Sequence, residues 1–113
     1  MVMERRTIEE IICGMEGSFQ PENAEDVNFV IQYRLSGEGG GDYYVVVADG
    51  VATVSEGVHE APDLTFMAEA LDYIMMDSGE LSGVKAFFAK KLRMEGETRL
   101  ASQLPKYFKP REV

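Results

Sequence analysis

Three carboxylates near the middle of the chain, Asp72, Asp77 and Glu80, are the side chains whose type and spacing could support acid–base chemistry. Two of them acting as a carboxylate pair would need a histidine, a cysteine or a metal ligand beside them to act on a substrate. Here a predicted turn at Gly79 interrupts the three, and they have no matching histidine, cysteine or metal ligand. A solvated helix end accounts for them better, so we predict no catalytic residues and a chain that is not an enzyme.

Cysteine and histidine occur once each, at Cys13 and His59. A single cysteine excludes an internal disulfide, and the two residues together do not make a metal-binding cluster. We interpret Cys13 as a small packing residue of the first helix and His59 as a solvated loop residue. The glycine-rich run 36–41 lacks a lysine and joins two predicted strands, which indicates a hairpin turn rather than a phosphate-binding loop. No metal ion or cofactor is expected.

The charges are unevenly distributed along the chain. A net charge of −9 argues against nucleic acid as a partner, since phosphate binding needs a local excess of basic residues. From position 85 onward, however, eight basic residues face three acidic ones, so this C-terminal segment carries +5 and the remainder −14. We favour a solvated helix face for it, and transient contact with an anionic membrane surface is the alternative.

Length and composition indicate one domain spanning residues 1–113. The 45% of apolar residues suffices for a core in a chain of 113 residues, which is too short for two such cores. No apolar run approaches the length that crosses a bilayer, and the first residues lack the apolar region of a signal peptide. We therefore expect a soluble, cytoplasmic protein.

The first half of the chain predicts one helix followed by three strands. Thr7 and Glu10 have the spacing of a capping box, and the helix that they start has an apolar face (Ile8, Ile11, Ile12 and Met15). Residues 27–35 alternate apolar and polar side chains, as in a strand with one buried face. Residues 43–48 are continuously apolar, which favours an interior strand buried on both faces. The dipeptide 49–50, Asp-Gly, predicts a tight hairpin into a third strand at 51–54.

The second half alternates strands and helices with few residues between them. A strand is predicted at 63–67, and a helix follows at 69–76 that Gly79 stops. Ser82 can cap a second helix, on which two aromatic rings, Phe87 and Phe88, are expected to reach the core. A strand at 92–95 and a helix at 100–108 complete the chain. Together these elements predict an α/β (α+β) fold with a five-stranded, mostly antiparallel sheet covered by helices.

Several of these segments occur in an order that resembles a known family. The segments are 86–88 (Ala-Phe-Phe), 91–94 (Lys-Leu-Arg-Met), Gly96 and 100–101 (Leu-Ala), preceded by 62–66 and 78–81. This order resembles the C-terminal signature of the sterol carrier protein 2 (SCP2) family of lipid-binding domains, in a stand-alone prokaryotic type. Two positions depart from it: Lys90, where relatives usually carry glycine, and Pro105, inside the expected last helix.

The resemblance implies a hydrophobic tunnel between the sheet and the later helices. We expect it where the strand from position 63, the helices from Glu69 and Ser82, and the last helix converge. The apolar residues predicted to line it are Phe66, Leu71, Met75, Phe87, Phe88, Leu92, Met94, Leu100, Leu104 and Phe108. Apolar periodicity alone does not separate a lipid-lined tunnel from a filled core, because both keep these side chains from water.

Two functions are compatible with the resemblance. The first is binding, and transfer or presentation, of a hydrophobic lipid such as a fatty acyl chain, an acyl-CoA, a sterol-like or an isoprenoid molecule. The alternative is an accessory or interaction module that assists a partner enzyme, for example in quinone or lipid metabolism, without a transport role.

Overall fold

The computed structural model describes residues 2–111. The chain begins and ends with helices, and most of its strands lie between them. In chain order the elements are α1 (Ile8–Cys13), α2 (Met15–Ser18), the 3-10 helix η1 (Pro21–Asn23), β1 (Phe29–Ser36), β2 (Gly41–Ala48), β3 (Val51–Glu56), β4 (Leu64–Glu69), α3 (Ala70–Ser78), α4 (Gly83–Phe88), β5 (Leu92–Gly96) and α5 (Arg99–Tyr107). Every predicted strand is present, and its ends lie within two residues of the prediction.

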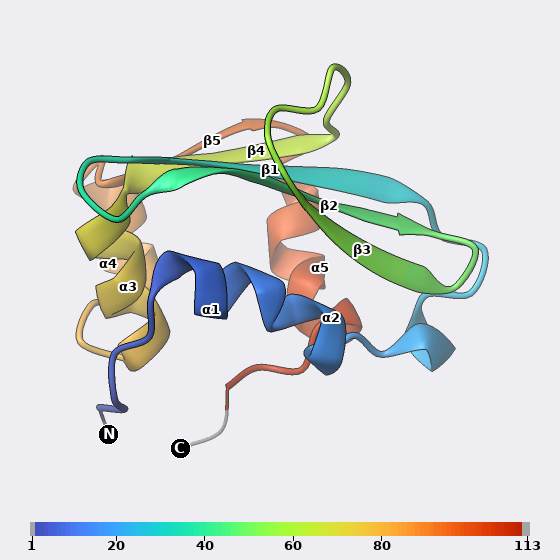
Figure 1. Ribbon diagram of the computed structural model, residues 1–113, viewed down its shortest axis with the longest axis horizontal. Helices are drawn as coiled ribbons and strands as arrows, with labels where there is room; N and C mark the ends of the chain where they lie inside the picture. The colour runs from blue at the N-terminus through green and yellow to red at the C-terminus, as the bar shows by residue number, and fades with distance from the viewer. Residues whose placement is uncertain (1, 112–113) are drawn as a thin grey trace.

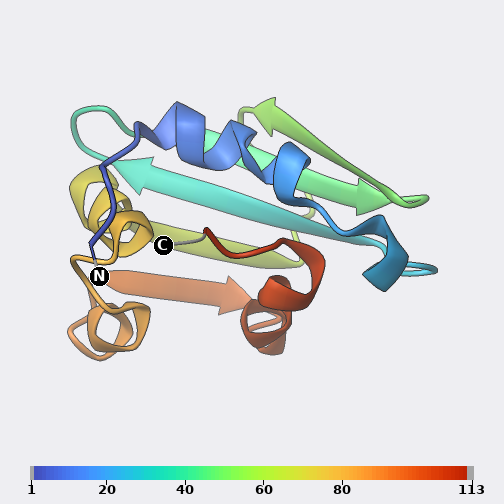
Figure 2. The same cartoon turned by 90° about the horizontal axis from the view of Figure 1, so that it is seen from below.

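Within residues 2–111 the strands form one five-stranded sheet in the order β3-β2-β1-β4-β5. The pairs β3–β2, β2–β1 and β4–β5 are antiparallel, whereas β1 and β4 run parallel. The α-helices lie on one side of this sheet, as Figures 1 and 2 show from two directions. The predicted fold class, a mostly antiparallel five-stranded sheet with helices, is confirmed.

Because the helices cover one face of the sheet, the strand side chains on that face are buried. In β1 the alternate residues Phe29, Ile31, Tyr33 and Leu35 are buried against the helices. In β2, Val45 and Val47 are fully buried, but Val46 between them is only half-buried. The prediction that β2 is buried on both faces is therefore wrong. The strand lies inside the sheet, yet no helix within residues 2–111 covers the other face of the sheet (Figures 1 and 2).

One polar residue on this open face is nevertheless buried. The Gln32 side chain donates to the carbonyls of Tyr43 and Gly57, both at 3.0 Å, and its oxygen accepts from the His59 amide at 2.7 Å. The loop between β3 and β4 is thus held down over the sheet. His59 lies in this loop, as predicted, but it is half-buried and has partners rather than being simply solvated.

The start of α1 confirms the predicted capping box. The Thr7 hydroxyl accepts from the Glu10 amide at 3.1 Å, and the Glu10 carboxylate accepts from the Thr7 amide at 2.9 Å. The helix ends earlier than expected, because Gly14 separates it from the single turn of α2. Cys13 is exposed on the outer side of α1, so its interpretation as a packing residue is wrong.

The buried face of α3 is rotated relative to the predicted one. Ala70 is buried and Tyr73 and Ile74 pack against the core, whereas Leu71 is 53% exposed. The spacing of positions 70, 73, 74 and 77 is the i, i+3, i+4, i+7 pattern of a helix face. Gly79 ends the helix in the left-handed region at φ 89°, as predicted.

Helix α4 contacts the sheet through a small residue. Ala86 is fully buried, but Phe87 is 45% exposed and Phe88 78% exposed. The expectation that both rings reach the core is therefore wrong. The helix ends in a Schellman motif, in which the Lys91 amide donates to the Ala86 carbonyl at 2.8 Å and Lys90 has φ 61°. This left-handed conformation explains why glycine suits position 90.

Helix α5 contains Pro105 and ends at Tyr107, one residue before the predicted end. The following residues, 108–111, form a segment that we call the C-terminal strap. Phe108 forms a β-bridge with Phe19, and the Lys109 amide donates to the Ser18 carbonyl at 2.8 Å. From there the strap crosses the helix side of the sheet toward α3 and residues 2–7, which we call the N-terminal arm (Figure 2).

Candidate functional site

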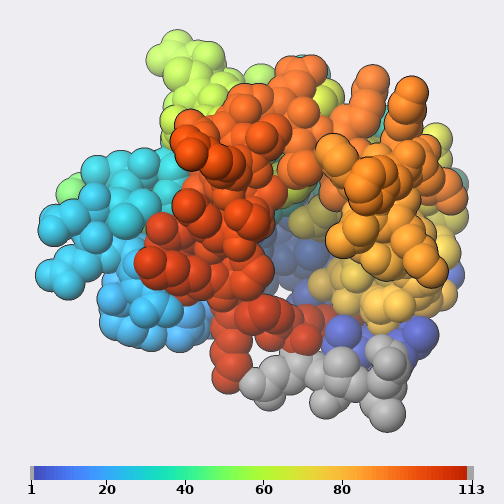
Figure 3. All heavy atoms as spheres, turned by 180° about the vertical axis from the view of Figure 1, so that it is seen from behind, coloured from blue at the N-terminus to red at the C-terminus, as the bar shows by residue number. Residues whose placement is uncertain are grey.

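A cleft of about 360 Å³ lies on the helix side of the sheet, bounded by α1, α2, α3, α5 and the C-terminal strap. Figure 3 shows the surface hollowed between α5 and α3. Most of its walls are apolar or aromatic, from Ile11, Met15, Tyr33, Tyr73, Leu104 and Phe108. This volume lies at the lower end of the range of natural small-molecule sites.

A second cavity of about 270 Å³ adjoins the cleft. Phe66, Met76 and Leu92 line it, and it shares Ile11, Tyr73 and Asp77 with the cleft. The side chain of Tyr73 therefore stands between the two spaces.

Two tyrosines form the inner wall of the cleft. The rings of Tyr33 and Tyr73 meet edge to face at 5.8 Å between centroids, and Tyr33 also stacks on Phe66 at 5.4 Å. Burial raises the pKa of the Tyr33 hydroxyl well above its ordinary value, and the nearby Tyr73 adds to this effect. Burial likewise raises the pKa of Tyr73 to about 12. Both hydroxyls are thus neutral at physiological pH, and the wall carries no charge.

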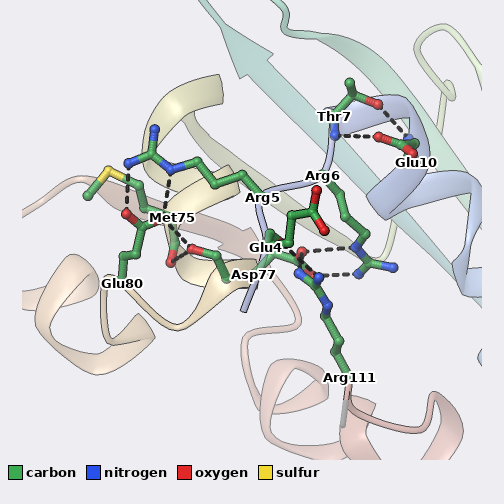
Figure 4. A network of polar contacts seen from close by, with 10 residues as sticks. Glu4, Arg5, Arg6, Thr7, Glu10, Met75, Asp77, Glu80 and Arg111 are labelled. Atoms are coloured by element: carbon green, nitrogen blue, oxygen red, sulfur yellow. Dashed lines mark hydrogen bonds and ion pairs between the residues drawn. The ribbon is translucent and has the colours of Figure 1, made fainter. Parts of the chain in front are cut away.

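Charged groups gather instead at the mouth of the cleft. The Asp77 carboxylate accepts from Arg6 at 2.6 and 3.0 Å and from Arg111 at 2.7 Å. Arg111 also donates to the Glu4 carbonyl at 2.6 Å. Figure 4 shows Arg6 and Arg111 converging on Asp77. The N-terminal arm, α3 and the C-terminal strap are therefore fastened together at one carboxylate, which we call the Asp77 latch.

The neighbouring carboxylate has a separate partner. Arg5 donates two hydrogen bonds to Glu80, at 2.7 and 2.8 Å, and Ser78 donates a further one. These hydrogen bonds lower the pKa of Glu80 to about 2, with the larger effect from Arg5 and the smaller from Ser78. The interpretation as a solvated helix end is wrong for Asp77, whose side chain is 10% exposed and paired with two arginines. Glu80 is exposed, as that interpretation expects, but is paired with Arg5. Each is occupied by arginine, and they do not form a joint carboxylate pair.

The predicted lining residues separate into groups. Phe66 and Leu92 line the second cavity, and Leu104 and Phe108 line the cleft. Leu100 is buried in the core, and Met94 packs against the core. Neither residue lines a cavity. Met75 is half-buried and is part of neither cavity.

Three further predicted residues are exposed and also line neither cavity. Leu71 borders a different pocket on the surface, beside Glu38 and Glu69. Phe87 and Phe88 point into solvent on α4. They line neither cavity, because the short helix α4 is buried against the sheet through Ala86.

Sequence reasoning missed Tyr73 and the arginines as site residues. Tyr73 could have been found from its spacing to Ala70 and Asp77, which places all three on one helix face. No local signal marks Arg6 or Arg111, since their shared partner is 71 and 34 residues away in the sequence.

Two classes of feature are not found within residues 2–111. No group of three or more histidine, cysteine, aspartate or glutamate side chains is arranged to hold a metal ion. None of the helices there combines the length and the apolar character that crossing a membrane requires.

Comparisons with known proteins agree with this geometry. Hydroxysteroid dehydrogenase-like protein 2 of Rattus norvegicus is 29% identical over 100 residues, which cover 88% of this chain but only 19% of that protein. The chain thus spans about a fifth of the length of this relative. A double mutant of the sec-alkyl sulfatase PisA1 superposes with a TM-score of 0.81 at 11% identity, over 95% of this chain and 17% of that one, which shows the fold alone.

A third comparison covers nearly all of both chains. The solution structure of palmitated SCP2L2 from Aedes aegypti superposes with a TM-score of 0.67 at 25% identity, over 88% of this chain and 91% of that one. The profile of the SCP-2 sterol transfer family matches residues 16–109, which include the cleft residues from Tyr33 to Phe108. The chain therefore belongs to the SCP-2 sterol transfer family.

Proposed function

We propose that residues 1–113 act as one lipid-binding domain that holds a hydrophobic lipid in the cleft and the adjoining cavity. The observation that carries this proposal is the mostly apolar lining beneath the C-terminal strap, in which aliphatic and aromatic side chains predominate and the charged Asp77 is ion-paired. Membership of the SCP-2 sterol transfer family and the likeness to a palmitated relative support it. A fatty acyl chain is the ligand to test first, and acyl-CoA, sterol-like and isoprenoid molecules are the other members of the class.

Burial alone supplies the binding energy in this proposal. Each buried methylene contributes about 0.8 kcal/mol, so a sixteen-carbon chain gains on the order of 12 kcal/mol before the cost of association. Phe66, Leu92, Leu104 and Phe108 are the predicted residues that we propose contact it. No step of this binding requires a catalytic group, so we propose that the domain itself catalyses no reaction.

The proposed setting is the cytoplasm, where the domain transfers its lipid to and from membranes. Contact with an anionic membrane through the basic C-terminal segment is part of this proposal. An alternative is that the domain presents lipid to a partner enzyme. The similarity to one fifth of a dehydrogenase-like protein favours this alternative, because there a segment similar to this chain belongs to a longer polypeptide.

Native mass spectrometry of gently purified protein tests the proposal. We expect a discrete mass excess that disappears on denaturation, and identification of the released lipid names the ligand class. A bare protein mass that persists after incubation with fatty acids, acyl-CoAs and quinones would instead mean that the cleft does not accept lipids. In the same assay, co-purification with a specific enzyme would support presentation over transfer.

Two leucines provide matched variants for fatty acid binding. Leu104 lines the cleft, whereas Leu71 is exposed outside it. Leu104→Gln should weaken binding of a fluorescent fatty acid at least about tenfold, because a side chain of this size contributes about 1.5–3 kcal/mol on burial. Leu71→Gln should leave affinity within about twofold. Equal losses in the two variants would show that the lipid lies elsewhere.

A further inference from the structure

Helix α4 exposes an apolar surface that the lipid cleft does not use. Val84, Phe87 and Phe88 are the exposed large apolar residues of this six-residue helix. The two phenylalanine rings meet edge to face at 5.7 Å between centroids, so they form one aromatic cluster rather than two scattered side chains. Contiguous exposed apolar surface of this kind marks interaction sites in soluble proteins.

Basic residues flank this cluster in the sequence. Residues 83–93, which we call the α4 edge, contain four basic side chains and no acidic one, whereas the rest of the chain carries −13. Such a separation of charge orients the whole molecule near an anionic surface, with the α4 edge facing it. The described ion pairs include none of the four, Lys85, Lys90, Lys91 and Arg93.

Three of these cations line a pocket next to the helix. The pocket has a volume of about 510 Å³, and Arg34, Lys90, Lys91 and Arg93 line it together with the carboxylate residue Glu69. Arg34 and Arg93 flank Met67 in the register of β1, β4 and β5, on the sheet face opposite the lipid cleft. Arg34 is also paired with Asp42, at 3.6 Å. Lys90, Lys91 and Arg93 still outnumber the one lining carboxylate, Glu69, so the pocket favours a phosphate-sized anion.

The α4 edge also adjoins the lipid cavities. It continues directly into β5, where side chains alternate between the two sheet faces. Leu92 lines the second cavity, while its neighbours Lys91 and Arg93 line the basic pocket. Figures 1 and 2 show α4 and the start of β5 at the same end of the molecule, and Figure 3 shows α4 on its surface.

We propose that the α4 edge docks on the surface of an anionic lipid bilayer. Phe87, Phe88 and Val84 enter the boundary between headgroups and acyl chains, and the basic pocket receives the phosphate of a lipid headgroup. Binding of this type combines buried apolar area with attraction to anionic lipids, and both parts are present here side by side. This inference rests on the membrane contact in the proposed function and names its surface, a lipid phosphate being the partner chemistry.

Co-sedimentation with vesicles tests the docking. The full chain is mixed with vesicles of phosphatidylcholine alone or of phosphatidylcholine with phosphatidylglycerol, and the bound fraction is measured. We expect binding to the anionic vesicles that falls with added salt and is weak on the neutral ones. Inorganic phosphate at the concentration of the lipid phosphate should not displace the protein if a bilayer, rather than the free anion, is the partner.

Paired variants distinguish a specific role of the basic pocket from a general loss of positive charge. Lys91→Gln with Arg93→Gln should weaken binding to anionic vesicles about thirtyfold, since each cation contributes about fivefold. The control, Arg99→Gln with Lys106→Gln, removes the same charge from exposed positions on α5 and should change binding less than about fivefold.

The aromatic part has its own control. Phe87→Ser with Phe88→Ser should weaken vesicle binding at least about tenfold, because two inserted rings are lost. Val51→Ser with Val58→Ser removes exposed apolar residues from β3 and its following loop and should leave binding unchanged. Since Phe87 and Phe88 are exposed, their variants should fold normally, which circular dichroism checks.

Fatty acid uptake from solution, measured on every variant, distinguishes this inference from the proposed function. Unchanged uptake with lost vesicle binding supports the α4 edge as a docking surface. Equal binding to neutral and anionic vesicles, or equal losses in the test and control pairs, would overturn the inference and leave lipid binding untouched. Loss of uptake in the Phe87 and Phe88 variants would also overturn it, because these rings would then line the lipid site.

Discussion

The Asp77 latch allows a quantitative test of how the cleft is closed. The Asp77 side chain is 10% exposed, and those of Arg6 and Arg111 are 33% and 23% exposed. Exposed ion pairs contribute about 0.2–1 kcal/mol, whereas breaking a fully buried one costs about 3–5 kcal/mol. The latch lies between these limits. We therefore expect Asp77→Asn to lower the free energy of unfolding by about 2 kcal/mol.

A double-mutant cycle isolates the bond to the C-terminal strap. Urea unfolding of Asp77→Asn, Arg111→Gln and the double variant should give a coupling energy of about 1 kcal/mol. If the strap must leave its latch before lipid escapes, Arg111→Gln should also release a bound fluorescent fatty acid about fivefold faster, which stopped-flow dissociation measures.

The Arg5–Glu80 pair is the matched control, because it joins the N-terminal arm to the turn after α3 without touching the strap. Arg5→Gln should leave the rate of fatty acid release unchanged. The reasoning is refuted if the coupling between Asp77 and Arg111 is below about 0.3 kcal/mol. It is equally refuted if Arg5→Gln accelerates release as much as Arg111→Gln does.

Three further outcomes follow from local contacts. The Glu80 pKa is about 2 against an ordinary 4.5, so its stabilising contribution is complete above pH 4.5 and disappears as pH falls toward 2. In an NMR titration Arg5→Gln should raise the Glu80 midpoint toward 4.5, and an unmoved midpoint would contradict this cause. Lys90→Gly should raise the free energy of unfolding by up to about 1 kcal/mol, because φ is 61° there, whereas Ala89→Gly should lower it. Gln32→Leu should lower the free energy of unfolding by about 1–3 kcal/mol and speed hydrogen exchange at the His59 amide. Exchange at the wild-type rate there would show that Gln32 does not hold the loop between β3 and β4.

Much of the fold could be read from local sequence signals. The Thr7–Glu10 capping box, the alternation along β1 and the left-handed Gly79 all occur as predicted. At the 49–50 hairpin, Asp49 and Gly50 have φ of 54° and 74°, as a tight turn of this kind requires. These features depend on neighbouring residues alone, so the sequence determines them without the rest of the fold.

The residues of the candidate site could be predicted only where strand or helix periodicity identified a single buried face. Phe66 and Leu92 lie on the expected strand faces, and Leu104 lies on the expected side of α5. Phe108 lines the cleft from the first position after that helix. The short helix α4 has apolar residues on several sides, so its own pattern did not decide which would be buried. The close approach of Ala86 to the sheet decided it, and Phe87 and Phe88 were left in solvent.

The parallel pairing of β1 with β4 and the Asp77 latch belong to the tertiary structure alone. The pairing brings Tyr33 beside Phe66, and the latch joins Arg6 and Arg111 from opposite ends of the described chain. Periodicity and turn chemistry determine which side chains avoid water and which backbone angles are accessible. They do not determine which apolar surfaces meet or which charges pair at long range, because those contacts depend on how the finished elements pack in space.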